Sequence, residues 1–430
     1  MRLIKYPQKA DWPQLLARPT TDTTESRRRV EPILAAVRTG GDAALKHLTK
    51  QFDGVQLTDL QVSETEIEAA AALLPDELKT AIQTARSNIF AFHESQLHPP
   101  AMIETIPGVV CWRKSVGIEK VGLYIPGGTA PLFSTVLMLG VPAQIAGCRE
   151  VILCTPANRE GGVHPAILYA AQLVGIRTIF KVGGAQAIAA MTYGTETIPK
   201  VYKIFGPGNA YVTVAKQLVS QEGVAIDMPA GPSEVAVYAD DSANPDFVAA
   251  DLLSQAEHGT DSQVILVTES ETLIQKVQQA INRQLPALPR RDIAAKALEN
   301  SIFFLVETPA QAIELLNEYA AEHLILAVEN AEQVAEKITN AGSVFLGHYT
   351  PEAAGDYASG TNHTLPTNAY ARAYSGVSVD SFVKKITFQR ISPQGLQNIG
   401  ATVEIMAAAE GLEAHKQAVR LRLEELKSRS

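Results

Sequence analysis

Gln255 and His258 carry metal-binding side chains and stand three residues apart near the end of a predicted helix. On a helix, this spacing places both side chains on one face. An amide and an imidazole that face the same way suggest a clamp for a metal ion or a polar substrate rather than a core contact. We therefore expect the rest of the chain to supply the other ligands and the catalytic groups.

Other residues with metal-binding or proton-transferring side chains occur later in the chain. Glu322 and His323 follow a predicted helix and directly precede an apolar strand, so their side chains point in different directions. Asp356 lies in the long Gly-, Thr- and Asn-rich stretch 348–374, which is too long for an idle connection. His415 lies on a C-terminal helix with apolar neighbours, where a lone histidine is more often a core residue. Two imidazoles with oxygen donors nevertheless suit a divalent ion such as Zn²⁺. A ligand set chosen by residue type alone is Gln255, His258, Asp356 and His415.

The elements that must position these residues alternate between strands and helices. From residue 120 onward, short apolar strands are followed by glycine-containing turns and then by helices. This order is typical of a parallel sheet covered by helices on both faces, in which ligands lie at the carboxyl ends of the strands. A second alternating series begins near residue 235. We predict an α/β fold with two incomplete Rossmann-like parallel-sheet domains and small helical N- and C-terminal segments.

Three of the turns could approach a nucleotide, namely Pro126-Gly127-Gly128, Gly183-Gly184 and Gly206-Pro207-Gly208-Asn209. The last begins like a dinucleotide fingerprint, but Tyr211 stands where the third glycine is expected and Pro207 lacks an N–H for a phosphate. No acidic residue that could bind a ribose stands at the expected distance. A tight turn without a ligand explains this motif about equally well, whereas three such turns in one sheet favour a bound nucleotide.

Length and composition limit the classes of function. The chain has 430 residues, 46% of them hydrophobic and 19% charged, which indicates a globular protein with at least two domains. A net charge of −9 without a dense Lys/Arg cluster argues against nucleic-acid binding. We see no signal peptide and no apolar run that could span a membrane. The three cysteines have no C-x-x-C spacing, so we expect a reducing, cytoplasmic location.

A series of motifs between about residues 120 and 415 resembles the histidinol dehydrogenase family. The motifs are Gly206-Pro207-Gly208-Asn209, Ile226-Asp227-x-x-Ala230-Gly231-Pro232-Ser233-Glu234, Ser254-Gln255-Ala256-Glu257-His258, Ala321-Glu322-His323-Leu324, Gly355-Asp356-Tyr357 with Gly360-Thr361-Asn362-His363, and Glu410-Gly411-Leu412-x-x-His415. We find no departure at the key positions. A string of this length is far more specific than any single motif in it.

The resemblance implies an NAD-dependent oxidoreductase that converts L-histidinol to L-histidine, the last steps of histidine biosynthesis. Two successive hydride transfers would pass through an aldehyde. The implied cofactors are NAD and one Zn²⁺ per subunit, and the Zn²⁺ would hold the substrate rather than take part in the redox chemistry. The resemblance also implies a homodimer in which the terminal segments are exchanged.

The resemblance also implies a role for individual residues. His323 would be the general base of both oxidations, and Glu322 would activate the water that hydrates the aldehyde. Zn²⁺ would be bound by Gln255, His258, Asp356 and His415. The substrate would be contacted by Ser233, Gln255, His258, His323, Asp356, Glu410 and His415. NAD would be contacted by Tyr124, Gln186 and Asn209.

These implied roles agree with general chemistry. Oxidation of an alcohol needs a base that takes the hydroxyl proton as hydride leaves, and an imidazole poised near neutral pH suits that task. Oxidation of an aldehyde needs a nucleophile. Because no cysteine lies near a motif, hydration of the aldehyde is favoured over a thiohemiacetal.

The expected domain boundaries follow the two alternating series. Residues 1–25 form an N-terminal segment, and residues 26–120 with 234–376 form a first α/β domain with most of the metal ligands and the catalytic pair. Residues 121–233 form an inserted NAD-binding domain, and residues 377–430 form a C-terminal helical segment that is exchanged in the dimer.

Two other functions remain open on the residues alone. One is a zinc-dependent hydrolase on a doubly wound fold, in which Glu322 acts with metal-bound water. The other is a nucleotide-binding or metal-binding regulatory module without catalysis. Neither the H-E-x-x-H nor the H-x-E…C-x-x-C signature occurs, which counts against the common zinc peptidases and deaminases.

Overall fold

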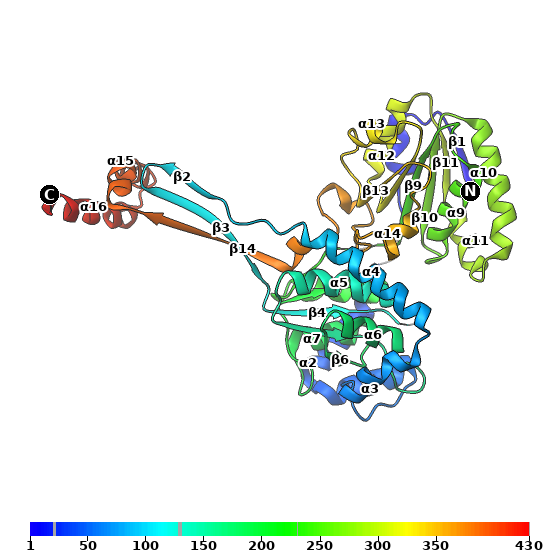
Figure 1. The fold of residues 1–430 in the computed structure, drawn as a ribbon, viewed down its shortest axis with the longest axis horizontal. Coiled ribbons are helices and arrows are strands. Elements are labelled where there is room, and N and C mark those ends of the chain that lie inside the picture. The colour runs from blue at the N-terminus through cyan, green and yellow to red at the C-terminus, as the bar shows by residue number, and fades with distance from the viewer. Residues whose placement is uncertain (20–22, 128–130, 230, 430) are drawn as a thin grey trace.

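The computed structural model describes residues 1–19, 23–127, 131–229 and 231–429 of the chain. Gly128 of the first predicted turn and Ala230 of the motif before Ser233 therefore lie outside the described residues. Figure 1 shows two lobes, each built of helices around a sheet, and a long arm that projects from them. No helix in the described ranges is long and apolar enough to cross a membrane.

The first lobe is built on a five-stranded parallel sheet with the order β6-β5-β4-β7-β8. Its strands are β4 (Lys120–Tyr124), β5 (Glu150–Cys154), β6 (Thr178–Phe180), β7 (Lys203–Phe205) and β8 (Ala225–Ile226). The connecting helices are α5 (Phe133–Ile145), α6 (Pro165–Leu173), α7 (Gly184–Tyr193) and α8 (Ala210–Ser220). The strands are short apolar runs because helices cover both faces of the sheet. This confirms the predicted alternation of strands and helices.

Three N-terminal helices pack on this five-stranded lobe: α2 (Thr23–Asp53), α3 (Glu64–Ala69) and α4 (Asp76–Glu94). Helix α2 contacts α7 and α8, and α4 contacts α5. Val30 and Leu45 of α2 share a buried cluster with Ile188 of α7. This packing differs from the expected grouping of residues 26–120 with 234–376. The apolar faces of these helices show that they are buried but do not show which sheet buries them.

The second lobe is built on a six-stranded parallel sheet with the order β1-β11-β10-β9-β12-β13. Its strands are β1 (Arg2–Lys5), β9 (Glu234–Ala239), β10 (Gln263–Thr268), β11 (Ile302–Leu305), β12 (His323–Ala327) and β13 (Ser343–Leu346). One face is covered by α9 (Pro245–Ala256), α10 (Glu271–Gln284) and α11 (Arg291–Glu299). The other face is covered by α1 (Trp12–Leu15), α12 (Pro309–Tyr319) and α13 (Ala331–Ala335).

The terminal segments contain strands that the sequence analysis did not predict. The N-terminal segment provides β1, which pairs with β11 at one edge of the six-stranded sheet. The C-terminal segment, which was expected to be helical, contains the nine-residue strand β14 (Val383–Ile391) before its helices. Most of β14 is exposed, so its side chains lack the buried periodicity that would have revealed its length.

The arm is a three-stranded antiparallel sheet that carries two helices at its tip (Figure 1). Strand β14 pairs with β3 (Val109–Gly117), which pairs with β2 (Met102–Ile106). The two helices are α15 (Pro393–Ala409) and α16 (Glu413–Ser428), and they pack against each other. Residues from both halves of the chain therefore build the arm.

The long polar stretch 348–374 is not entirely irregular. It contains the helix α14 (Glu352–Tyr357), on which Asp356 lies. Val377 N donates to Thr364 O at 2.9 Å shortly after this stretch ends. The helix and this hydrogen bond thus hold the stretch in a defined conformation between the second lobe and the arm.

Candidate active site

The two sheets meet at a cavity of about 1210 Å³. Tyr124, the last residue of β4, and the turn before α8 line it from the five-stranded lobe. Ser233, which precedes β9, and His258, which precedes β10, line it from the six-stranded lobe. The carboxyl ends of one sheet therefore face the amino ends of the other across the cavity.

The residues expected to contact a nucleotide lie together on one wall of this cavity. Tyr124, Gln186 and Asn209 all line it. The Tyr124 hydroxyl accepts a hydrogen bond from Gly184 N at 3.1 Å. Asn209 caps α8, because its side-chain oxygen accepts from the backbone N–H of Tyr211 and of Val212. The sequence-based expectation that these turns share one site agrees with this geometry.

Gly206 holds the turn before α8 close to β4. An added Cβ at Gly206 would clash with the carbonyl oxygen of Tyr124, and the φ of Gly206, +135°, is unfavourable for other residues. Lys216 Nζ donates to Gly206 O at 2.9 Å, and Gly206 N donates to Asp227 Oδ2 at 2.8 Å. Lys216 and Asp227 also form a buried ion pair. The turn is therefore fixed from both sides by opposite charges.

Glu322 and His323 lie at the amino end of β12, and both are buried. His323 Nε2 lies 3.2 Å from Asp356 Oδ1, and its Nδ1 lies 3.3 Å from Glu234 O. Glu322 Oε2 accepts from Glu234 N at 2.9 Å. The predicted catalytic pair is thus held by the first residue of β9 and by α14.

Burial and charge shift the pKa values of this pair. Burial raises the pKa of the Glu322 carboxyl to about 8. Burial alone would lower the pKa of His323, but the carboxylates of Glu322 and Asp356 outweigh it and raise that pKa to about 10. The imidazole of the free chain therefore keeps a proton at neutral pH unless the negative charge around it is offset.

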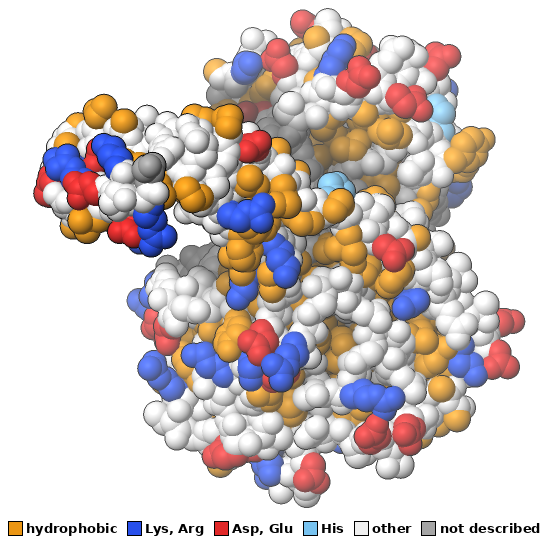
Figure 2. Space-filling model, turned by 60° about the vertical axis from the view of Figure 1, so that its left-hand side comes forward, with side chains coloured by type: hydrophobic (Ala, Val, Ile, Leu, Met, Phe, Trp, Pro, Cys, Tyr) orange, Lys and Arg blue, Asp and Glu red, His pale blue; other side chains and the backbone are white. Residues whose placement is uncertain are grey.

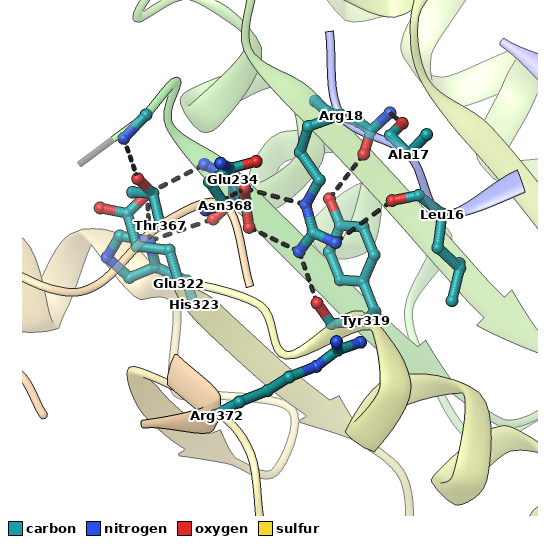
Figure 3. Close-up of polar contacts among 12 residues, drawn as sticks. Leu16, Ala17, Arg18, Glu234, Tyr319, Glu322, His323, Thr367, Asn368 and Arg372 are labelled. Atoms are coloured by element: carbon teal, nitrogen blue, oxygen red, sulfur yellow. Dashed lines mark hydrogen bonds and ion pairs between the residues drawn. The ribbon is translucent and has the colours of Figure 1, made fainter. Parts of the chain in front are cut away.

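A buried ion pair lies behind the catalytic pair (Figure 3). Arg18 Nε donates to Glu234 Oε1 at 3.0 Å, and a second guanidinium nitrogen donates to Glu234 Oε2 at 2.9 Å. The guanidinium also lies 3.7 Å from the centre of the Tyr319 ring and donates to Tyr319 O. The Arg18 side chain is 6% exposed and that of Glu234 is 0% exposed. This pair fixes the start of β9, and the backbone of Glu234 in turn binds both Glu322 and His323.

The connection after α14 also contacts the start of β9. Asn368 N donates to Glu234 Oε1 at 2.6 Å, and Thr367 Oγ1 accepts from Gly231 N. Figure 3 shows Thr367 and Asn368 beside Glu234, on the side away from Arg18. Residues 367–368 therefore fasten the segment that carries Ser233 into the cavity.

The candidate metal ligands come together only in part. Gln255 is buried beside Glu322, and with its amide rotated its Nε2 donates to Glu352 Oε1 at 3.0 Å. His258 and Asp356 are close enough for the carboxylate to raise the pKa of the imidazole, although desolvation dominates and lowers it. Helix α9 ends at Ala256, so His258 lies just beyond it, and the expectation that both residues share a helical face was wrong. The chain turns there because Glu257 and His258 bond back to the last turn of the helix.

Glu410 and His415 lie away from these residues in the single chain. Glu410 caps the end of α15, and His415 is in the first turn of α16, at the tip of the arm (Figure 1). Among the residues described, no group of three or more His, Cys, Asp or Glu could hold a metal ion. Of the four expected metal ligands, His258 and Asp356 are therefore close to each other, Gln255 lies beside Glu322, and His415 lies apart from them on the arm.

Several residues of the site were not assigned by the sequence analysis. Arg18 and Asn368 stand in no motif, so nothing in the sequence pointed to them. Glu234 and His363 stand inside motifs but were given no role. His363 Nδ1 lies 2.9 Å from Asp356 O, and its Nε2 lies 3.0 Å from Thr135 Oγ1 of the other lobe. The sequence signal for Glu234 and His363 was that each is a polar residue in a motif that also contains, or adjoins, a residue with an assigned role.

Comparison with known proteins reveals close similarity over the whole chain. A family model described as Histidinol dehydrogenase matches residues 16–423. A histidinol dehydrogenase of Bacteroides thetaiotaomicron is 63% identical over 427 residues, which cover 99% of this chain and 100% of that protein. One of Vibrio parahaemolyticus is 55% identical over 399 residues, which cover 92% of each. The crystal structure of a histidinol dehydrogenase from Elizabethkingia anophelis is 56% identical, with a TM-score of 0.97 and 99% coverage of both chains.

Removal of Arg18 should destabilise the protein strongly. Arg18→Met leaves the Glu234 carboxylate buried without a counter-charge, so we expect a loss of about 3–5 kcal/mol in the free energy of unfolding. Urea denaturation followed by circular dichroism measures it. Adding Glu234→Gln to this variant should recover most of the loss, because the unpaired charge is then gone.

Arg27→Met is the matched control, because Arg27 forms an exposed ion pair with Glu31 at 2.6 Å. It should cost less than about 1 kcal/mol. Equal losses for the two arginine variants would contradict the role given to the buried pair.

Proposed function

Because the chain belongs to the histidinol dehydrogenase family, we propose that it oxidises L-histidinol to L-histidine with two molecules of NAD in succession, the last steps of histidine biosynthesis. The observation that carries the proposal is the cavity of about 1210 Å³ between the sheets. Its lining joins the expected NAD contacts Tyr124, Gln186 and Asn209 to the expected substrate contacts Ser233 and His258. Cofactor and substrate would meet there, as hydride transfer requires.

The two steps assign different work to the catalytic pair. In both oxidations, His323 takes the proton from the hydroxyl of the substrate while hydride passes to NAD. Between them, Glu322 orients and activates the water that hydrates the aldehyde, because its raised pKa makes it an effective base near neutral pH. Asp356, at 3.2 Å from His323 Nε2, and Glu234 O, at 3.3 Å from Nδ1, keep the imidazole in place.

The residues present fit one Zn²⁺ per subunit. Desolvation lowers the pKa of His258, which keeps an imidazole lone pair free at neutral pH. The hydrogen bond from His323 and nearby imidazoles overcome the effect of burial and lower the pKa of Asp356, so its carboxylate stays ionised. Gln255, His258, Asp356 and His415 would hold the ion. When bound, Zn²⁺ would fix the imidazole and amine of the substrate and offset the negative charge that raises the pKa of His323.

We further propose that the protein is a homodimer in which the arm of each subunit reaches the cavity of the other. Glu410 and His415 would then contact substrate and metal in the partner. Support comes from the apolar side chains on the arm, several of which are visible in Figure 2. Exposed examples from α15, α16 and β14 are Ile405, Met406, Leu421 and Phe388. A monomer would leave these side chains in water.

We also propose a cytoplasmic location for this activity. Cys111, Cys148 and Cys154 are all free thiols, and Cys154 is buried. Cysteines remain reduced in a reducing compartment such as the cytoplasm.

The overall activity can be tested by absorbance. Histidinol and NAD should yield two NADH per histidinol, a strong chelator should abolish the reaction, and added Zn²⁺ should restore it. Metal analysis should show about one Zn²⁺ per active subunit. A zinc hydrolase would form no NADH. A binding module would also form no NADH, and the chelator would have no activity to abolish.

Glu322→Gln should separate the two steps. The amide preserves the shape of the side chain but cannot accept a proton, so oxidation of the aldehyde should fall about 10²–10⁴-fold while oxidation of the alcohol changes far less. Single-turnover reactions that start from histidinol or from its aldehyde measure each step. An equal fall in both steps would overturn the role of Glu322 in water activation.

The exchanged arm predicts complementation between two inactive variants. In a mixed dimer of Asp356→Asn with His415→Asn, one site carries both substitutions and the other carries neither. Equal co-expression should therefore restore about a quarter of the wild-type activity, since about half of the dimers are mixed. Mixtures that stay inactive, or a fully active monomer in sedimentation, would rule out a shared site.

A further inference from the structure

Asp53 places a carboxylate without a partner in the wall of the cavity. It is the last residue of α2 and lies among the cavity-lining residues. Its Oδ2 atom is buried, and no described residue donates a hydrogen bond to it. A buried acceptor without a donor is costly. Asp53 as a whole is only partly buried, so a ligand in the cavity can reach its carboxylate and supply a hydrogen-bond donor.

The surroundings of Asp53 belong to the cofactor side of the cavity. The negative charge of Asp53 contributes to the raised pKa of Tyr124, so the two side chains are close. Phe52, whose side chain is 51% exposed, also lines the cavity and offers an aromatic face. Non-helical backbone at Gly41 divides α2, and the half before it contributes Arg29 to the same wall.

The direction of a bound dinucleotide follows from the positions of these residues. The nicotinamide must lie near the substrate, beside Ser233 and His258 of the six-stranded lobe. Helix α2 packs on α7 and α8 of the five-stranded lobe. The adenosine half of NAD, with its ribose diol, therefore falls at the end of the cavity that α2 forms.

We propose that Asp53 accepts hydrogen bonds from the ribose hydroxyls of the adenosine half of NAD and thereby excludes NADP. The proposal rests on the proposed function, which assigns the cavity to NAD. Two neighbouring hydroxyls can both donate to one carboxylate, whereas a 2′-phosphate would bring negative charge against it. Arg29 does not offer that phosphate a free cation, because it pairs with Glu25 at 2.8 Å and donates to Tyr211 Oη at 3.1 Å.

The test compares Asp53→Asn with wild type for both cofactors. NADH and NADPH binding is measured by fluorescence, and kcat/KM is measured with NAD and NADP. We expect NADH to bind about tenfold more weakly to the variant, and the preference for NAD over NADP to fall by at least about tenfold. The melting temperature without cofactor should stay the same or rise, because the variant loses a desolvated charge.

Asp59→Asn is the matched control, since it makes the same charge change at an exposed residue outside the cavity lining. It should leave both cofactor affinities unchanged. If Asp53→Asn proves unstable, Asp53→Ser supplies the same comparison with a smaller side chain.

Competition with 5′-AMP and nicotinamide mononucleotide locates the effect. Asp53→Asn should weaken 5′-AMP and leave nicotinamide mononucleotide unchanged. Weaker nicotinamide mononucleotide, equal losses for NADH and NADPH, or no change in either would overturn the proposal for Asp53. Failure of the wild-type protein to bind NADH at all would instead overturn the proposed function.

Discussion

The buried ion pair between Arg18 and Glu234 holds the catalytic half of the molecule together. Burial of two charges is unfavourable, and here it is offset by two parallel hydrogen bonds, by the Tyr319 ring and by a further donor from Asn368. Because Glu234 is also the first residue of β9, its backbone is available to Glu322 and His323. The charge pair therefore fixes the backbone to which Glu322 and His323 are hydrogen-bonded.

A second constraint is the way in which the two sheets meet. Ligands of parallel sheets usually lie at the carboxyl ends of strands, where glycine turns lead into helices. The five-stranded lobe follows this rule at Tyr124 and Asn209, but the six-stranded lobe presents the amino ends of β9 and β10, at Ser233 and His258. The two walls of the cavity thus come from opposite strand ends, and Glu322 and His323 lie behind the second wall at the amino end of β12.

The sequence predicted those parts of the fold and site that local patterns determine. Apolar runs and glycine turns predicted the two alternating series of strands and helices, although not the edge strand β1, and the motifs located Glu322 and His323. The arm was missed because β14 is exposed in the single chain and carries no buried alternation. Arg18 and Asp53 were missed for another reason, because they act on residues far along the chain. In a dinucleotide fingerprint the ribose-binding acid follows the glycine turn, whereas Asp53 precedes that turn by more than a hundred residues.

The order of the strands has a consequence for synthesis of the chain. The strands of the five-stranded lobe and the helices packed on them come from residues 23–226, so they are translated before β9 begins, whereas Val377 and Phe382 join the core of this lobe later. Strand β1 is made first, but its only neighbour in the sheet is β11, and Arg18 pairs with a residue 216 positions later. The N-terminal segment therefore cannot reach its final contacts until most of the polypeptide has left the ribosome, and until then the Arg18 guanidinium stays hydrated. The strands and helices that carry Tyr124, Gln186 and Asn209 are therefore synthesised before those that carry Glu322 and His323.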